Sequence, residues 1–344
     1  MSTVTNPRAR RMVLAGAVLS SAALALTACS SGSQGGSEGP VKLSFAHTVE
    51  VKHPVNRCGA EIFKESVEKA SDGNITIEIF PAGQLGTEAA QSDSAIAGDV
   101  DITQPSAGHL SEYYEPLSVL NAAFLFDSYS SMLEVARGDA GQELWKGLED
   151  KTGLVVLDIY PQGIRQVTTK GVEVRKPEDL SGVSMRAADA PIWITNVSAL
   201  GATPTPMALG EVYTGLQQGV IDAQENPVNL VASNSFDEVQ DHVSLTNHVV
   251  QGNPLVINGD RWAGLSEEQQ NILKDAAKES SASLQKCLED DFTTIVQEWK
   301  DKGTMKVTED VDIDAFRKHA EPVLMKEFGD VWGDQYKKIR DAQG

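Results

Sequence analysis

Polar and charged side chains gather where the predicted strands of this chain end. In open α/β sheets, ligands bind just beyond the carboxyl ends of the strands. Two of these side chains are arginines, Arg165 and Arg186, whose planar guanidinium groups can meet a carboxylate with two parallel hydrogen bonds. The others are hydroxyl, carboxylate and amide groups at Thr48, Glu88, Ser106, Asp189 and Asn226. These residue types predict a binding site for a small, polar, anionic ligand.

Common motifs of covalent and metal-dependent catalysis are absent from the sequence. It contains no G-x-S-x-G nucleophile motif, no H-E-x-x-H zinc motif and no G-x-x-x-x-G-K-[ST] phosphate loop. Its three cysteines offer no C-x-x-C spacing for structural zinc. The sequence therefore gives little support for an enzyme, and we expect no cofactor or metal; that the protein binds without catalysis is implied by the resemblance described below. A secreted sugar-acid hydrolase remains an alternative, because paired carboxylates cannot be excluded by counting in a chain with 49 acidic residues.

The charge balance excludes two classes of partner. The 344 residues carry 29 basic and 49 acidic side chains, a formal net charge of −20. A nucleic-acid-binding protein needs a basic face to neutralise phosphates, and a polybasic membrane-surface protein needs clustered lysine and arginine. Neither class fits this composition. The length and the 41% apolar content instead predict folded domains, about two in number.

The first 28 residues are predicted to be a signal peptide. Arg8, Arg10 and Arg11 form a positive start, and residues 12–26 form an apolar stretch. This stretch is too short for a comfortable membrane span of about 20 residues, and small residues follow it. The pattern is typical of a secretory signal.

The end of this signal, Leu26-Thr27-Ala28-Cys29, resembles the bacterial lipobox. The resemblance implies cleavage before Cys29 and lipidation of its thiol, with a plain secretory signal as the alternative. Residues 29–40 are rich in Ser and Gly, the composition of a flexible tether. We therefore expect an extracytoplasmic protein anchored to the cell membrane.

The body of the chain is predicted to alternate strands and helices, which favours parallel βαβ units. The clearest helix begins with Ser266-Glu267-Glu268-Gln269, a capping-box pattern, and its apolar spacing continues to about residue 302. Such a helix would be roughly 54 Å long at about 1.5 Å per residue, so it should lie across two domains. The predicted strands are 42–47, 75–79, 100–103, 153–160, 182–186 and 220–223, and the other helices include 54–70 and 191–200.

Two further cysteines, Cys58 and Cys287, both lie on apolar stripes of predicted helices. Outside the cytoplasm disulfides persist, so the two cysteines could pair. Two separate buried thiols are the alternative, and we favour it. A bond would require Cα atoms within about 7 Å of each other.

Several stretches, in matching order and spacing, resemble the DctP-like solute-binding proteins of tripartite ATP-independent periplasmic (TRAP) transporters. The similarity extends from about residue 41 to the last residues. The most specific stretches are GATPTPM at 201–207, EVYTGLQQGVID at 211–222 and QENP at 224–227. The supporting stretches are GQLG at 83–86, GIRQVT at 163–168, PEDLSG at 177–182 and FDEVQ at 236–240.

The resemblance implies an α/β fold of the periplasmic-binding-protein type, with two lobes, a ligand cleft between them and a long helix crossing both. One lobe would comprise residues 41–162 and 251–290, and the other residues 163–250 and 291–344. It implies a monomer that binds a small carboxylate, such as a sugar acid, and delivers it to the membrane subunits of a TRAP permease. A lipoprotein that presents its solute to a membrane sensor is a further alternative.

Residue roles also follow from the resemblance. Arg186 matches the arginine that clamps the solute carboxylate, Arg165 matches a second arginine, and Asn226 matches the amide of the QENP motif. Leu209 departs from the family, many members of which carry an aromatic residue there, and Trp193 could supply a replacement ring. Solute-specific polar groups are expected at Thr48, Glu88, Ser106 and Asp189.

Each of these residues also has a purely structural interpretation. An arginine at a strand end can belong to an ion pair, and Asn226 before a proline can form a turn. Glu88 and Asp189 could be acids at helix starts, which interact favourably with the helix dipole. Trp193, on a predicted helix, could belong to the core.

Overall fold

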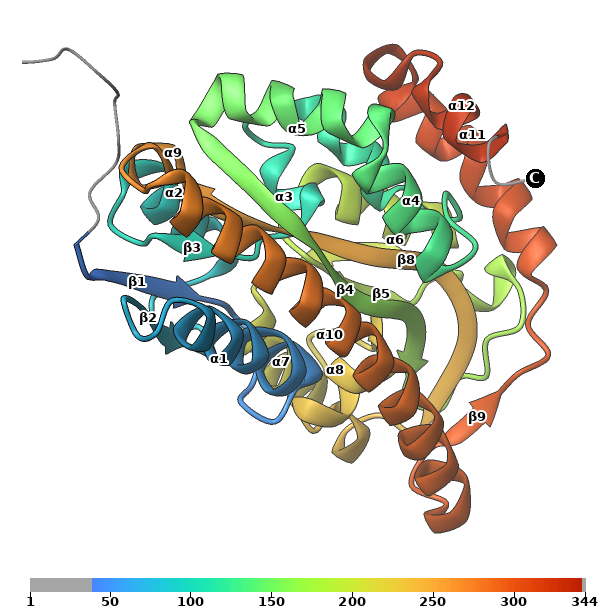
Figure 1. The fold of residues 1–344 in the computed structure, drawn as a ribbon. Helices are drawn as coiled ribbons and strands as arrows, with labels where there is room; N and C mark the ends of the chain where they lie inside the picture. The colour runs from blue at the N-terminus through green and yellow to red at the C-terminus, as the bar shows by residue number, and fades with distance from the viewer. Residues whose placement is uncertain (1–38, 342–344) are drawn as a thin grey trace, which may run out of the picture. The chain divides into compact units, whose positions relative to one another are not determined.

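Residues 39–341 are described by the structure, a computed structural model. Within this range, nine strands form one mixed sheet in the order β2-β1-β3-β8-β4-β7-β5-β6, with β9 beside β8 (Figure 1). The strands are β1 (Val41–Ala46), β2 (Ile75–Phe80), β3 (Ile102–Thr103), β4 (Leu154–Thr169), β5 (Ser184–Ala187), β6 (Thr203–Pro206), β7 (Ala223–Pro227), β8 (His242–Asn258) and β9 (Lys306–Thr308).

Helices cover both faces of this sheet. They are α1 (Glu61–Ala70), α2 (Glu88–Ala97), α3 (Ala107–Leu110), α4 (Tyr129–Arg137), α5 (Asp139–Thr152), α6 (Pro191–Leu200), α7 (Val212–Gln218), α8 (Val228–Ser233), α9 (Gly259–Ala263), α10 (Glu267–Lys302), α11 (Ile313–Trp332) and α12 (Gln335–Asp341). Shorter turns are the π-helical η1 (Val55–Ala60) and the 3-10 helices η2 (Glu115–Asn121), η3 (Pro177–Leu180), η4 (Leu209–Glu211) and η5 (Phe236–Glu238).

Two hydrophobic clusters lie on opposite faces of the sheet. Side chains of α1, α7, α8 and α10 belong to one cluster, and those of α4, α5, α6 and α11 belong to the other. Strand β8 shows the division, because Leu255 and Ile257 join the first cluster and Val256 joins the second. Successive side chains of a strand point to opposite faces, so β8 is apolar on both of its faces here.

The central pair of strands differs from the prediction. The strand predicted at 153–160 continues to Thr169, and β8, which was not predicted, runs antiparallel to it along most of its length. The sheet is therefore mixed rather than purely parallel. The sequence signal was weak because Gln251, Gly252 and Asn253 interrupt the apolar pattern and Pro254 normally argues against a central strand.

Strand β7 also begins later than predicted. Residues 220–222 form a turn after α7, which ends at Gly219 in the left-handed conformation with a φ of 72°. The strand itself holds the QENP motif, and Asn226 lies opposite Gln166 of β4. The motif therefore belongs to the sheet rather than to the loop that was expected to follow the strand.

Helix α10 confirms its prediction. The Ser266 hydroxyl accepts a hydrogen bond from the backbone of Gln269, and the helix continues without interruption to Lys302. It crosses the central strands (Figure 1), where Ser281 donates a hydrogen bond of 2.7 Å to the Ile159 carbonyl. Farther along, its Leu288 carbonyl accepts a hydrogen bond of 3.3 Å from Asn229 of α8.

A disulfide joins Cys58 of η1 to Cys287 of α10, so the favoured alternative of two separate thiols is wrong. Their Cα atoms lie 6.4 Å apart, although 229 positions separate the two cysteines in the sequence. The sequence could not place η1 beside α10, because that neighbourhood depends on how both elements pack on the sheet.

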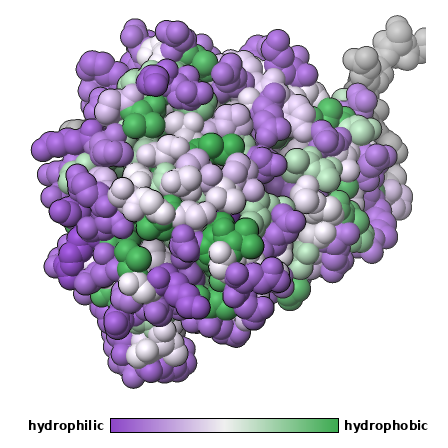
Figure 2. Space-filling view, turned by 180° about the vertical axis from the view of Figure 1, so that it is seen from behind, coloured by the Kyte–Doolittle hydropathy of each residue, from purple (hydrophilic) through white to green (hydrophobic). Residues whose placement is uncertain are grey.

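The predicted signal peptide (1–28), Cys29 and most of the predicted tether (29–40) lie outside the described residues. Among the helices of the described range, none combines the length and apolarity of a membrane span. On the face shown in Figure 2, hydrophobic residues occupy separate small patches among hydrophilic ones. Large hydrophobic side chains are exposed at Val51, Leu85 and Val220.

Candidate ligand-binding site

Two adjoining cavities lie where β1 and β5 end, beside the middle of β4 and β8. The outer cavity has a volume of about 660 Å³, and the inner one about 50 Å³. They share Thr48, Glu88, Arg186 and Leu209 in their linings. The structure brings all eight predicted site residues together here, with Asp189 in the outer lining and Ser106, Arg165, Trp193 and Asn226 in the inner one. Their role in binding a ligand stays a prediction.

Strand ends and helix starts supply most of these side chains. Thr48 follows β1, Glu88 begins α2, and Ser106 caps α3 by accepting a hydrogen bond from the backbone of His109. Arg186 lies within β5, next to its last residue, and Asp189 is the second residue after that strand. These residues therefore lie at or near the ends of strands or at the starts of the helices that follow them, as the sequence predicted.

A tight turn at residues 81–86 forms part of the outer wall. Backbone hydrogen bonds attach it to the segment after β1, with Ala82 donating to Val49 at 2.9 Å and Gly83 donating to His47 at 3.1 Å. Gly86 has a φ of 108°, and a Cβ atom there would meet Ala90 at 2.9 Å. The glycine is therefore required by both conformation and space.

Arg186 is a buried cation without an ion pair. Its side chain is 4% exposed, and its Nε donates a hydrogen bond of 3.0 Å to the Met207 carbonyl. Within residues 39–341 it forms no salt bridge. Burial and the neighbouring charge of Arg165 lower its pKa to about 10, so the guanidinium stays protonated at neutral pH. An uncompensated buried charge is unfavourable, so this position favours an incoming anion.

Arg165 is also buried, but it has a counter-ion. Its guanidinium forms a two-pronged ion pair with Glu225, in which Nη2 lies 2.7 Å from Oε1, and Nη1 donates to Gln251 at 2.7 Å. The guanidinium carbon lies 4.5 Å from the centre of the Trp193 ring. The ion-pair interpretation therefore holds for Arg165, which retains little capacity to bind a further carboxylate directly.

Glu225 is held as a carboxylate by the groups around it. Burial alone would raise its pKa, but Arg165 and His248 lower it to about 2. His248 lies 2.9 Å from Glu225, and burial lowers the pKa of this imidazole. These three residues form a buried network, which we call the inner network, beneath the inner cavity.

Trp193 and Glu88 serve both the structure and the cavity lining. Trp193 is 1% exposed and belongs to the hydrophobic core, yet its ring lines the inner cavity and its Nε1 donates to Ser106 at 3.4 Å. Glu88 accepts a hydrogen bond of 2.5 Å from the Ser106 backbone and lies 3.3 Å from Nδ1 of His109. Trp193 is therefore more than a core residue, and Glu88 is more than an acid at a helix start, because both also line a cavity.

Gln251 and Asn253 also line the inner cavity and were missed by sequence reasoning. They lie on β8 and form a hydrogen bond of 2.9 Å. Gln104 and Gln162, which follow predicted strands, line the same cavity, and Gln104 donates to Gln162 at 3.1 Å. A signal did exist, because Gln251 and Asn253 are two apart and so share a strand face. It could not be used while β8 itself was not predicted.

The described residues hold no group of three or more His, Cys, Asp or Glu side chains suited to a metal ion. The cavities instead combine one unpaired guanidinium with carboxylates, hydroxyls and amides. This arrangement can bind an anion and hydrogen-bond to polar groups beside it.

The sequence was compared with known proteins. Residues 45–330 match the family model of bacterial extracellular solute-binding proteins, family 7, also named DctP. A solute-binding protein of Roseobacter denitrificans is 38% identical over 216 residues, which cover 62% of this chain and 66% of that protein. The 2,3-diketo-L-gulonate-binding periplasmic protein of Escherichia coli is 33% identical over 257 residues, which cover 75% of this chain and 78% of the relative.

Solved structures agree with these sequence matches. A TRAP periplasmic solute-binding protein of Polaromonas, bound to D-erythronate, has a TM-score of 0.82 at 29% identity, covering 87% of this chain and 98% of that one. Another, from Roseobacter denitrificans with bound L-galactonate, has a TM-score of 0.79 at 30% identity, covering 88% and 99%. These relatives are binding proteins of transporters rather than enzymes. The chain therefore belongs to the DctP-like family of TRAP solute-binding proteins, with their two-lobed α/β fold.

Proposed function

We propose that this protein binds a small organic anion whose carboxylate pairs with Arg186. The observation that carries the proposal is the buried guanidinium, 4% exposed and without an ion pair in the described part of the chain. A ligand carboxylate would supply the missing charge and could accept two parallel hydrogen bonds. The cavity volume of about 660 Å³ lies in the usual range for small-molecule sites.

Within this class we propose a sugar acid rather than a dicarboxylate. Glu88 and Asp189 line the same cavity as Arg186, and they would repel a second carboxylate on the ligand. Hydroxyl groups, in contrast, can donate hydrogen bonds to these carboxylates. The hydroxy acids bound by the two relatives described above fit this pattern.

A thermal-shift panel tests the proposal. L-Galactonate, D-erythronate, succinate and the neutral polyol galactitol would each be titrated against the protein. A ligand at one hundred times its dissociation constant adds about 2.7 kcal/mol of stability. We expect a clear shift with a hydroxy acid, a smaller one with succinate and none with galactitol. Equal shifts with galactitol, or no shift with any organic acid of a wider panel, would reject the proposal.

We also propose that the cavity closes between the two predicted lobes, 41–162 with 251–290 and 163–250 with 291–344. Of the three crossings, one lies inside α10 and two lie inside the central strands, where the register of β4 against β8 shifts between Pro161 and Gly163. An irregular ladder is a natural place for a bend. A ligand that contacts both lobes would favour the closed state. Small-angle scattering with and without ligand would detect the closure.

We further propose that the mature protein is a monomeric lipoprotein, anchored outside the cytoplasm through Cys29, that delivers its solute to TRAP permease subunits. The lipobox, the tether and the family support this proposal. The intact mass of the membrane fraction should correspond to loss of residues 1–28 and addition of diacylglycerol. A soluble mature form without lipid would contradict the anchor. Deletion of neighbouring permease genes should abolish uptake of the bound acid.

A further inference from the structure

The segment between β1 and η1 forms one wall of the cavity. Thr48 lines both cavities, and Glu50 lines the outer one. This segment, residues 47–52, is called the wall loop below. It has neither helical nor strand structure, and it is held by backbone hydrogen bonds to residues 80–83 and by side-chain contacts.

Neighbouring residues of η1 supply those contacts. Asn56 lies 3.1 Å from Nε2 of His47 and donates a hydrogen bond of 3.2 Å to the Val51 carbonyl. Arg57 donates one of 2.9 Å to the Lys52 carbonyl. The wall loop is therefore attached to η1 at both of its ends.

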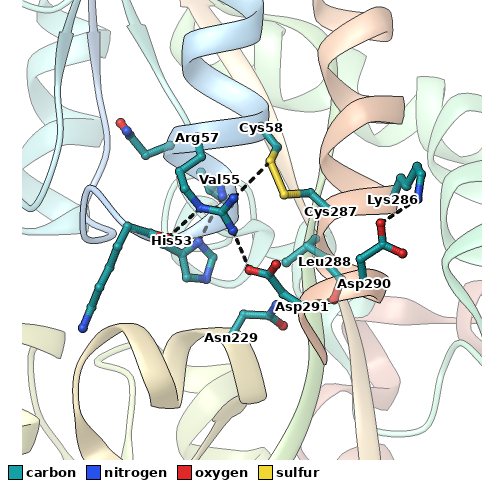
Figure 3. The surroundings of a disulfide bond; sticks show 12 residues. His53, Val55, Arg57, Cys58, Asn229, Lys286, Cys287, Leu288, Asp290 and Asp291 are labelled. Carbon is teal, nitrogen blue, oxygen red and sulfur yellow. Dashed lines mark hydrogen bonds and ion pairs between the residues drawn. A yellow bond between two sulfur atoms is a disulfide. The ribbon is translucent and has the colours of Figure 1, made fainter. Parts of the chain in front are cut away.

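The π-helical segment η1 is itself fixed to residues 287–291 of α10 (Figure 3). Cys58 is bonded to Cys287, and Arg57 forms an ion pair of 2.5 Å with Asp291. Arg57 thus connects the carboxylate of α10 with the backbone of the wall loop. The bond and the ion pair together are called the α10 clamp.

The same turn of α10 supports a second wall of the cavity. Asn229 of α8 donates a hydrogen bond of 3.3 Å to the Leu288 carbonyl, between the two residues of the clamp (Figure 3). Next to Asn229, Leu230 lines the inner cavity, and Asn234 after α8 lines the outer one. Residues 287–291 of α10 therefore contact both η1, which holds the wall loop, and α8, which forms the second wall, although these two segments are far apart in the sequence.

We propose that the α10 clamp is a positioning device for ligand binding: Cys58–Cys287 and Arg57–Asp291 hold the wall loop in its binding position relative to α8. The inference rests on the function proposed above. A wall that is fixed before the ligand arrives loses less conformational freedom on binding, which raises affinity. The disulfide should contribute more than the ion pair, because Arg57 and Asp291 are 42% and 31% exposed and exposed ion pairs are weak.

The first test needs no ligand. Amide hydrogen exchange would be compared in the oxidised protein, in protein reduced with dithiothreitol and in the Cys58→Ala/Cys287→Ala variant. Reduction transfers two electrons and two protons to the disulfide, giving two thiols and cyclic oxidised dithiothreitol. We expect faster exchange in residues 47–60 and 228–234 and unchanged exchange in 313–341. Unchanged exchange in the wall loop, or a uniform increase along the chain, would overturn the proposal.

The second test measures affinity, with L-galactonate as the probe. The double alanine variant should bind about tenfold more weakly, chiefly through faster dissociation, and Arg57→Ala should lose less. Arg57→Lys, which keeps the charge, should recover part of that loss. Leu324→Ala, a buried change in α11 away from the cavity, is the matched control. It should lower the melting temperature without changing the affinity of folded protein.

The outcomes separate the two proposals. If no acid binds the unmodified protein but the local exchange change occurs, the proposed function fails, and only the fixation of the wall loop by the clamp stands. If the acid binds with equal affinity to the unmodified protein and to the double alanine variant, the clamp proposal is wrong and the function stands. An equal affinity loss in Leu324→Ala would show that the disulfide acts only through global stability.

Discussion

The surroundings of Arg165 and Arg186 differ although both arginines are buried beside the same cavities. Arg165 is paired with Glu225 and packs against Trp193, whereas Arg186 donates to one backbone carbonyl and has no carboxylate partner within the described residues. Arg165 therefore already has its counter-ion inside the protein. Arg186 has none, and a ligand carboxylate can supply it.

This comparison shows why two arginines that both lie near predicted strand ends should not be given equal roles. Removing Arg165 would leave Glu225 as a buried charge without its main partner. Removing Arg186 would instead relieve the cost of burying an unpaired cation. The account therefore assigns folding stability to the surroundings of Arg165 and ligand affinity to those of Arg186.

The largest expected effect is on stability, from breaking the inner network. Arg165→Ala or Glu225→Gln should each lower the free energy of unfolding by about 3–5 kcal/mol, because each leaves a buried charge unpaired. Urea denaturation of the ligand-free protein measures this. Asp150→Asn, which breaks the exposed Lys146–Asp150 pair, is the control and should cost less than about 1 kcal/mol.

A double variant sharpens this result. Arg165→Ala combined with Glu225→Gln should cost less than the sum of the single changes, because the charge left by one substitution is removed by the other. Strict additivity would mean that the two side chains do not depend on each other, contrary to the geometry.

Acid should weaken folding while Arg186 stays charged. Burial lowers the pKa of His47 to about 4, that of His53 to about 3 and also that of His248, all from 6.5. The folded protein therefore binds fewer protons than the unfolded chain below about pH 6.5, and stability falls with falling pH. Each unit of pKa difference is worth about 1.4 kcal/mol per group.

Glu225 adds a second acid-sensitive step. Its folded pKa of about 2 lies below the ordinary value of 4.5, so its stabilising contribution is lost as the pH falls from about 4.5 towards 2. Urea midpoints measured between about pH 7.5 and about pH 4 would show the histidine part. The variant His248→Gln should flatten the curve, and a pH-independent midpoint in the unmodified protein would contradict the assignment of buried neutral histidines.

The smallest expected effect concerns selectivity beside Arg186. Glu88→Gln removes one of the carboxylates that should repel a second ligand carboxylate, so the affinity for succinate should rise several-fold relative to L-galactonate. A change of about 1 kcal/mol, or roughly fivefold, is the expected scale. Calorimetry with both acids checks this, and Glu112→Gln, which does not line the cavities, is the matched control. An unchanged ratio would remove Glu88 from the account of selectivity.

Local patterns predicted the elements that depend on neighbouring residues. The capping box at Ser266 and the apolar spacing after it predicted α10, and the predicted helix 191–200 is α6. The strand-end argument, together with the family resemblance, gathered the eight site residues that line the cavities. Each of these local signals is encoded within a few neighbouring residues, although the site residues extend from Thr48 to Asn226.

Features that depend on distant partners could not be predicted in this way. The Arg165–Glu225 pair requires the register of β4 against β7, in which Val167 lies opposite Glu225. Strand β8 carries polar residues because it lines the cavity, which removes the alternation that reveals strands. The disulfide requires that η1 pack against α10, across 229 positions of sequence.

Calorimetry of Arg186→Ala with the acid identified by the thermal-shift panel tests the central claim most directly. We predict an affinity loss of about 2–5 kcal/mol, roughly thirty- to several-thousand-fold, with no loss of ligand-free stability. Arg186→Lys should also bind poorly, because an ammonium group lacks the two-pronged geometry. If Arg186→Ala binds within about threefold of the unmodified protein, a change of only ~0.65 kcal/mol, Arg186 is not the carboxylate site and the account is contradicted.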